Sequence, residues 1–174
     1  VRAMVADGAD VNAVENDSGM HLTPLHIASQ EDMVNVLLNA GANVHAQDHE
    51  GRTALHHAIE YGHFDVVNVL LNAGASVNIQ DDGGWTLLHF ASDEGCIDIV
   101  NILINAGALV NVQDNEGHTP LHFASEHDNL DVINVLLNAG ASVNTQDHEG
   151  STALHHPIEY GHFDVVNVLL NAGA

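Results

Sequence analysis

The chain repeats itself every 33 residues, and this period limits its fold more than any other feature. The tetrapeptide Thr-x-Leu-His begins at Thr23, Thr53, Thr86, Thr119 and Thr152, at spacings of 30, 33, 33 and 33 residues. A Gly-Ala pair follows an apolar run with the same period of 33. A unit of this size cannot bury its apolar faces alone, so neighbouring units must cover them. The sequence therefore predicts a stack of repeated units.

Each unit reads as two short helices followed by a turn. Thr119 is a favourable N-cap, and Pro120 suits the first helical position, where its missing N–H is no loss. A turn glycine such as Gly95 can end the first helix in the left-handed conformation. Asp131 stands in the first turn of the second helix, where the helix dipole favours an anion. Residues 47–51 have turn composition and predict a hairpin tip between units.

This pattern resembles the ankyrin repeat. The resemblance covers essentially the whole chain and recurs in register in five units. It implies an all-α solenoid of stacked helix-turn-helix units with short β-hairpin loops, which serves as a protein-binding module or scaffold and not as an enzyme. The residues that carry it, with their counterparts one period away, are Gly117, Thr119, Pro120, Leu121, His122, Ala124, Asp131, Val135, Leu136, Leu137, Gly140, Ala141, Val143 and Asn144.

The repeats are expected to form one continuous array. Its parts are a partial repeat at 1–12 with only a second helix, repeat 1 at 13–45, repeat 2 at 46–78, repeat 3 at 79–111, repeat 4 at 112–144 and a truncated repeat 5 at 145–174. The incomplete units favour a fragment of a longer array, with self-association through the uncapped ends as the alternative.

Repeat 1 departs from the pattern, because three residues are added to its hairpin and three are removed from its helix pair. The segment from Ala13 to Leu22 should therefore project as a longer finger. Insertion and deletion without function, and a finger that contacts a partner, both explain this change. Its helix pair is also expected to lack the usual turn glycine, since Ser29, Gln30 and Glu31 occupy the turn.

A proline interrupts the pattern in repeat 5. Pro157 replaces the alanine found at Ala58, Ala91 and Ala124. In a regular helix interior, proline removes a hydrogen bond and costs about 3 kcal/mol. We therefore expect repeat 5 to be the least stable.

Residues 48–75 and 147–174 are near copies of each other. They differ at two of 28 positions, with Arg52 against Ser151 and Ala58 against Pro157. Duplication of a three-repeat block accounts for the identity. Either the duplication has no functional meaning, or two copies of one surface recognise a repeated ligand.

Charge excludes several function classes. The chain has 24 Asp and Glu against two basic residues, both arginine, for a formal charge of −22. Binding to nucleic acid or to anionic membranes needs basic side chains, so neither is expected. Apolar runs of three or four residues are too short for membrane insertion. The single cysteine, Cys96, predicts a reducing, intracellular compartment, and the lack of lysine fits the cytoplasm of a eukaryotic host cell if the protein is a bacterial effector.

No catalytic, metal or cofactor site is predicted from the histidines or the cysteine. Of the 15 histidines, five occupy the Thr-x-Leu-His slot, where the ankyrin resemblance implies a structural imidazole that bonds to the hairpin backbone. His57 and His156 stand where other repeats have Phe or Ile, so partial burial is expected. Nearby Asp93 and Glu94 should raise the pKa of Cys96.

The resemblance places a partner across the hairpin tips and the inner faces of the first helices. This surface is acidic and carries Trp85, Tyr61 and Tyr160, which the stacking does not require and which we expect as exposed anchors. Charge complementarity favours a basic protein partner. The candidate partner-binding residues are His49, Glu50, Arg52, Glu60, Tyr61, Asp82, Trp85, Asp93, Glu94, Asn115, Glu116, His118, Glu126, His127, His148, Glu149, Ser151, Glu159 and Tyr160.

Three functional hypotheses remain from the sequence. The first is a non-catalytic protein-interaction module that uses this acidic, aromatic-bearing concave face. The second is a regulatory or spacer segment of a larger protein, such as a bacterial effector, whose activity lies elsewhere. The third is an inhibitor that mimics nucleic acid through its dense negative charge.

Overall fold

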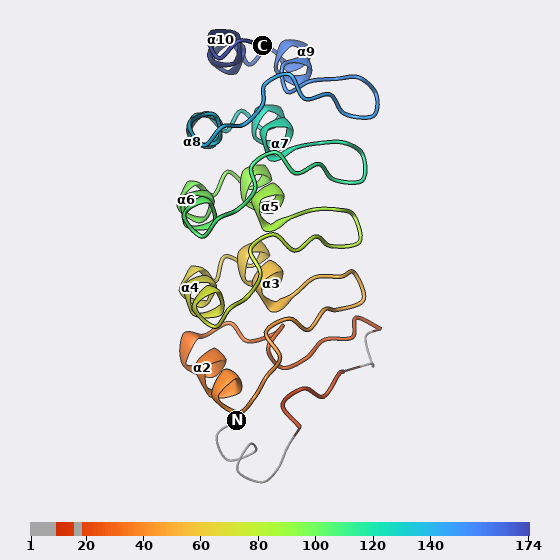
Figure 1. Ribbon diagram of the computed structural model, residues 1–174, viewed down its shortest axis with the longest axis vertical. Helices are drawn as coiled ribbons and strands as arrows, with labels where there is room; N and C mark the ends of the chain where they lie inside the picture. The colour runs from red at the N-terminus through yellow and green to blue at the C-terminus, as the bar shows by residue number, and fades with distance from the viewer. Residues whose placement is uncertain (1–9, 16–18) are drawn as a thin grey trace. The chain divides into compact units, whose positions relative to one another are not determined.

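The computed structural model describes residues 10–15 and 19–174, which fall into two compact units, 1–82 and 83–174. Each unit consists of helix pairs joined by hairpin loops (Figure 1). The described residues contain helices and isolated β-bridges but no longer strand, which confirms the all-α prediction. The predicted helix within residues 1–9 and the finger tip at 16–18 lie outside the described residues.

Within each unit, helices from neighbouring repeats pack on one another. Unit 1 contains α2 (Glu31–Asn39), α3 (Ala54–Glu60) and α4 (Phe64–Asn72). Unit 2 contains α5 (Leu87–Asp93), α6 (Ile97–Asn105), α7 (Pro120–Glu126), α8 (Leu130–Asn138), α9 (His155–Tyr160) and α10 (Phe163–Asn171). In unit 2 the first helices α5, α7 and α9 form one row, and the second helices α6, α8 and α10 form another (Figure 1). The core lies between these two rows.

A threonine and a histidine close the start of the first helices α3, α5 and α7. The backbone N–H of Thr119 donates to Nδ1 of His122 at 3.0 Å, so the imidazole occupies the capping-box place that Glu or Gln usually takes. Because Nδ1 accepts, the proton resides on Nε2, which in His89 donates to the carbonyl of His118 in the next repeat at 3.1 Å. The predicted structural role is confirmed. The bond from threonine N–H to Nδ1 is present at His26, His56, His89, His122 and His155.

The second helices are amphipathic and tightly covered on one side. In α4 the side chains of Val66, Val67 and Leu70 are at most 2% exposed. Gly74 follows the helix with φ of +88°, so the predicted left-handed cap is confirmed. Close stacking also demands glycine in the hairpins, since a Cβ on Gly84 would lie 2.7 Å from the backbone N of Asn115.

Repeat 1 loses its three residues from the first helix. Residues 24–27 form only a turn, and α2 follows at Glu31. The predicted shorter helix pair is therefore confirmed, and its connecting turn lacks glycine as expected. The longer hairpin is closed by an antiparallel bridge in which the N–H of Glu15 donates to the carbonyl of Leu22 at 2.8 Å.

Pro157 does not lie in a helix interior, so that expectation was wrong. The corresponding helix α3 begins at Ala54, whereas α9 begins at His155, two residues later in the repeat. Pro157 thus becomes the third residue of α9, in the first turn, where a backbone N–H has no helical acceptor. The helix α9 therefore begins later than α3, and no hydrogen bond is lost from the middle of the helix.

We predict that Pro157→Ala raises the melting temperature by about 2–4 °C, because alanine lets the helix begin earlier, as α3 does. Differential scanning calorimetry measures this change. Ala58→Pro in the sister repeat is the matched control and should lower the melting temperature. An unchanged or lower value for Pro157→Ala would contradict the prediction.

We also predict that acid weakens the fold. Burial lowers the pKa of both His56 and His89 to about 4, while the unfolded chain titrates near 6.5. The unfolded state therefore binds more protons between these values, and stability falls as the pH drops from about 6.5 towards 4. At pH 5 each of these two histidines should lower the free energy of unfolding by on the order of 1–2 kcal/mol.

Urea unfolding at pH 7.5 and pH 5 measures this loss. His89→Gln should flatten the pH dependence, and His155→Gln, at an exposed counterpart, should leave it unchanged. A pH dependence that survives His89→Gln in full would refute the assignment.

Candidate functional site

An aspartate fixes the backbone turn in the hairpin tips of repeats 2, 4 and 5. Oδ1 of Asp114 accepts from the backbone N–H of Glu116 at 3.0 Å and of His118 at 2.7 Å. Asp147 makes the equivalent bonds to Glu149 and Ser151. Burial acts to raise the pKa of Asp147, but these backbone bonds and the nearby His118 outweigh it and leave the pKa below its ordinary value. Asp147 therefore stays charged, and both aspartates hold their tips in shape.

In repeats 2 and 4 the residue after the hairpin glycine links its own tip to the next repeat. In repeat 4 this residue is His118, whose Nδ1 lies 3.5 Å from Asp114 Oδ2 and whose Nε2 lies 3.4 Å from Asp147 Oδ2. In repeat 2 it is Arg52, whose guanidinium reaches Asp81 in the following repeat at 3.7 Å. We call this position the tip slot; repeats 2 to 5 fill it with Arg52, Trp85, His118 and Ser151.

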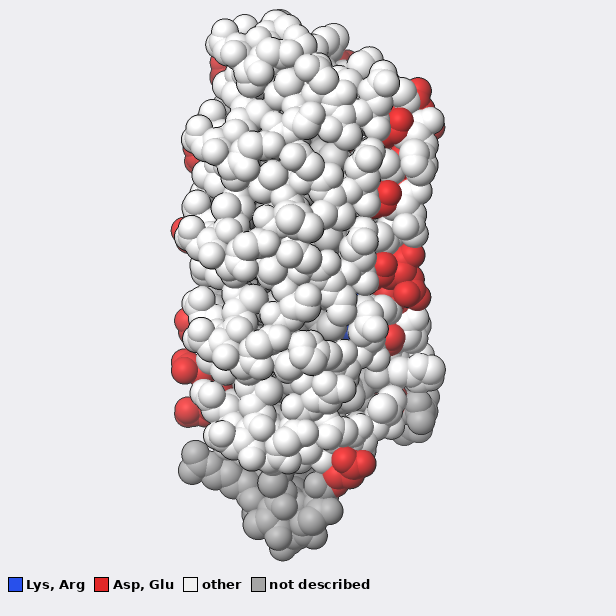
Figure 2. Space-filling model, viewed as in Figure 1, with Lys and Arg blue, Asp and Glu red and all other residues white. Residues whose placement is uncertain are grey.

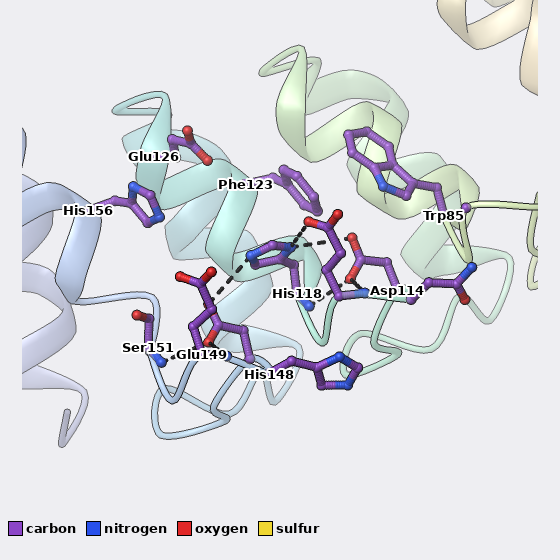
Figure 3. A pocket seen from close by; sticks show the side chains of 13 residues that line it. Trp85, Asp114, His118, Phe123, Glu126, His148, Glu149, Ser151 and His156 are labelled. Carbon is purple, nitrogen blue, oxygen red and sulfur yellow. Dashed lines mark hydrogen bonds and ion pairs between the residues drawn. The ribbon is translucent and has the colours of Figure 1, made fainter.

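Unit 2 contains a groove of about 980 Å³ between its hairpin tips and first helices (Figure 3). Five of its thirteen lining residues carry carboxylates, and Trp85 and Phe123 supply an aromatic wall. The lining residues are Gly83, Trp85, Asp114, Asn115, Glu116, His118, Phe123, Glu126, Asp147, His148, Glu149, Ser151 and His156.

Trp85 takes part in the packing, contrary to the sequence expectation. Its ring centroid lies 4.3 Å from that of Phe123 in the next repeat and 4.9 Å from that of Phe90. The side chain is half-buried, because these two rings give the hairpin tip an aromatic cluster to rest on. The expectation that stacking does not require Trp85 was wrong, and replacing it would disturb the fold as well as the groove.

The two tyrosines are exposed as expected. Tyr61 is 63% exposed and stacks on His57, and Tyr160 is 61% exposed and stacks on His156. Both histidines are partly buried, as predicted. Neither tyrosine lines the groove of unit 2.

Only some of the predicted partner-binding residues line the groove. Eight of the predicted residues line it: Trp85, Asn115, Glu116, His118, Glu126, His148, Glu149 and Ser151. Unit 2 places others outside this lining: Asp93, Glu94, His127, Glu159 and Tyr160. Asp93 pairs instead with His127 at 2.8 Å. The remaining six lie in unit 1: His49, Glu50, Arg52, Glu60, Tyr61 and Asp82.

Sequence reasoning missed several lining residues. Phe123 and His156 both follow the Thr-x-Leu-His motif directly, so that shared position was a signal for the groove wall. Asp114 and Asp147 recur after glutamine in the hairpins, and this periodicity marked them as tip residues. Gly83 carries no comparable signal.

Acidic side chains gather at the edges of the surface. In Figure 2 the acidic atoms of each unit lie along the hairpin side and along the opposite helical edge, and the face between them is mostly uncharged. Unit 2 has no lysine or arginine in its sequence. Its hairpin side therefore presents negative charge that no strong base of the same unit neutralises.

The lone thiol is not set up as a nucleophile. Burial raises the pKa of Cys96, and Glu94 and Asp98 raise it further. The predicted direction is confirmed, with Asp98 taking the part expected of Asp93. In the described parts of the chain, no group of three or more His, Cys, Asp or Glu side chains could hold a metal ion. No helix among these residues is both long and apolar enough to cross a bilayer.

Stacked helix pairs, histidine-closed capping boxes and hairpin tips define a helical repeat protein. A family model described as ankyrin repeats (3 copies) matches residues 1–81, 25–114 and 88–174. The chain therefore belongs to the ankyrin-repeat family, whose repeats are generally protein-interaction modules.

Two curated relatives share part of this sequence. Rabankyrin-5 of Homo sapiens and Rabankyrin-5 of Mus musculus are each 40% identical over 72 residues. Each match covers 34% of this chain and 6% of the relative. The chain thus corresponds to a small fraction of the length of these relatives.

Proposed function

We propose that this protein is a non-catalytic interaction module whose acidic groove binds a basic segment of a protein partner. The groove itself is the observation that carries the proposal. Glu116, Glu126 and Glu149 line it beside the tip aspartates, with an aromatic wall at one side. A partner that brings arginine or lysine supplies the positive charge that unit 2 lacks.

The physics of the groove favours this kind of partner. Carboxylates that share a partly enclosed groove repel one another, so a cation placed among them relieves repulsion and gains attraction. The Trp85 and Phe123 rings add apolar surface for the aliphatic stems of lysine or arginine, and their faces attract cations. Association should be fast and should weaken with salt.

A second candidate function is a regulatory or spacer segment of a larger protein whose activity lies elsewhere. The comparison favours it, because the matched relatives are far longer than this chain. We also propose that the protein is located in a reducing cytoplasm, which includes that of a host cell if the protein is a bacterial effector. The single cysteine and the lack of lysine support this location.

Removing the groove charges tests the interaction. The variant Glu116→Gln, Glu126→Gln, Glu149→Gln should bind a fluorescent peptide of alternating arginine and glycine at least about tenfold more weakly, since each charge contributes about 0.5 kcal/mol. Fluorescence anisotropy at 50 and 300 mM salt provides the measurement.

The matched control removes three charges from the first turns of the second helices, by Asp98→Asn, Asp131→Asn and Asp164→Asn. These aspartates are exposed and do not line the groove. The control should bind within about twofold of the unaltered protein. Equal losses in both variants would show attraction to net charge alone and would overturn the groove assignment.

A further inference from the structure

We propose that the tip slot at Ser151 is a binding site for a single arginine side chain of a partner protein. The partner's guanidinium occupies the place that Arg52 fills within unit 1. This inference rests on the proposed function and narrows it, since it names the residue type and the position where that residue binds.

The duplicated segments provide the first step. The hairpin tips of the two copies are built alike: the N–H of Asp48 donates to the carbonyl of Arg52 at 2.9 Å, and the N–H of Asp147 donates to the carbonyl of Ser151 at 2.9 Å. In the opposite direction, the N–H of Arg52 donates to Oδ1 of Asp48 at 2.9 Å, and the N–H of Ser151 donates to Oδ1 of Asp147 at 2.8 Å. The tip slot therefore has the same backbone hydrogen bonds in both units.

The helical side of the slot is also preserved. Tyr61 stacks on His57 with ring centroids 6.0 Å apart and an interplanar angle of 20°. Tyr160 stacks on His156 at 6.1 Å and 14°. The last turn of α9 thus keeps the arrangement of α3 although α9 begins later. Each tyrosine directly follows a glutamate of the slot, Glu60 in unit 1 and Glu159 in unit 2.

Unit 1 shows which ligand this arrangement accepts. Nη1 of Arg52 lies 3.4 Å from Glu50 Oε2 and 3.2 Å from Glu60 Oε2, so one guanidinium bridges a tip carboxylate and a helix carboxylate. The planar fork of arginine has five N–H donors and suits two acceptors on different elements. The ammonium of lysine is a point charge and matches this geometry less well.

Unit 2 keeps the two glutamates that bind the guanidinium in unit 1 and lacks the cation. Glu149 and Glu159 correspond to Glu50 and Glu60, and Ser151 is too short to reach either. Within residues 83–174, all of which the structure describes, neither glutamate has a basic side chain within ion-pair distance. In repeats 3 and 4 the chain fills the slot with Trp85 and His118.

The Ser151 slot opens into the groove. Ser151 and Glu149 both line the groove, and Figure 3 shows them with His156 at one end of it. Nδ1 of His156 is buried, and no described residue forms a hydrogen bond with it. In unit 1 the equivalent histidine, His57, pairs through Nε2 with Asp48 at 2.8 Å. The groove end at Ser151 therefore holds polar groups that the protein itself leaves unmatched.

Titration of the whole chain with acetyl-Gly-Arg-Gly-amide tests the slot, with amide chemical shifts followed by NMR. We expect one saturable site that shifts Gly150 and Ser151. The peptide with neutral citrulline in place of arginine should not shift them, and the lysine peptide should bind more weakly.

Two substitutions test whether the peptide binds at the tip slot itself. Ser151→Arg fills the slot from within and should abolish the saturable shift at Gly150. Arg52→Ser empties the sister slot and should create a second site that shifts Gly51. Ser142→Arg adds the same charge at an exposed position outside the groove and is the matched control; it should leave the site intact.

The outcomes separate this inference from the proposed function. Equal losses with Ser151→Arg and Ser142→Arg, or no new site with Arg52→Ser, would overturn the arginine slot and leave the acidic groove standing. If the longer arginine and glycine peptide also fails to bind the unaltered protein at 50 mM salt, the proposed function falls with it.

Discussion

In unit 2 a buried neutral imidazole joins repeat 3 to repeat 4 and repeat 4 to repeat 5, and the positions of the hairpin tips depend on it. Nδ1 of His122 accepts from the N–H of Thr119 and closes the capping box, while Nε2 faces the carbonyl of Ser151 in the following hairpin at 3.4 Å. One side chain thus starts a helix and sets the position of the next tip. The ring can do both only while neutral, and its burial lowers its pKa accordingly.

Once the tips are placed, their carboxylates set the charge of the hairpin side. Asp48, Asp114 and Asp147 each use one carboxylate oxygen to bind the backbone of their own tip. The residue in the tip slot then determines the ion pairs at each tip. Arg52 pairs with nearby glutamates, His118 links two aspartates, and Ser151 provides no cation for its glutamates. The duplicated segments thus carry arginine at the paired slot and serine at the open one.

Much of the fold could be predicted from the sequence, because the 33-residue period, the caps and the glycines act locally. The two errors involved non-local adjustment. Pro157 was expected to break a helix, but the helix start moved instead, which local propensity does not reveal. Trp85 was expected to be exposed, but it packs on Phe123, 38 residues away in the sequence. The groove itself depends on three successive repeats, so the sequence suggested its tips and Trp85, while the wall residues Phe123 and His156 were missed.

The proposed partner binds on the hairpin side of unit 2 and at no other face of that unit. Hydrogen–deuterium exchange of the whole chain, with and without the arginine and glycine peptide, tests this most directly. The account predicts added protection at residues 114–118 and 147–151, with none in α8 or α10. Protection in those second helices without protection at the tips would contradict it.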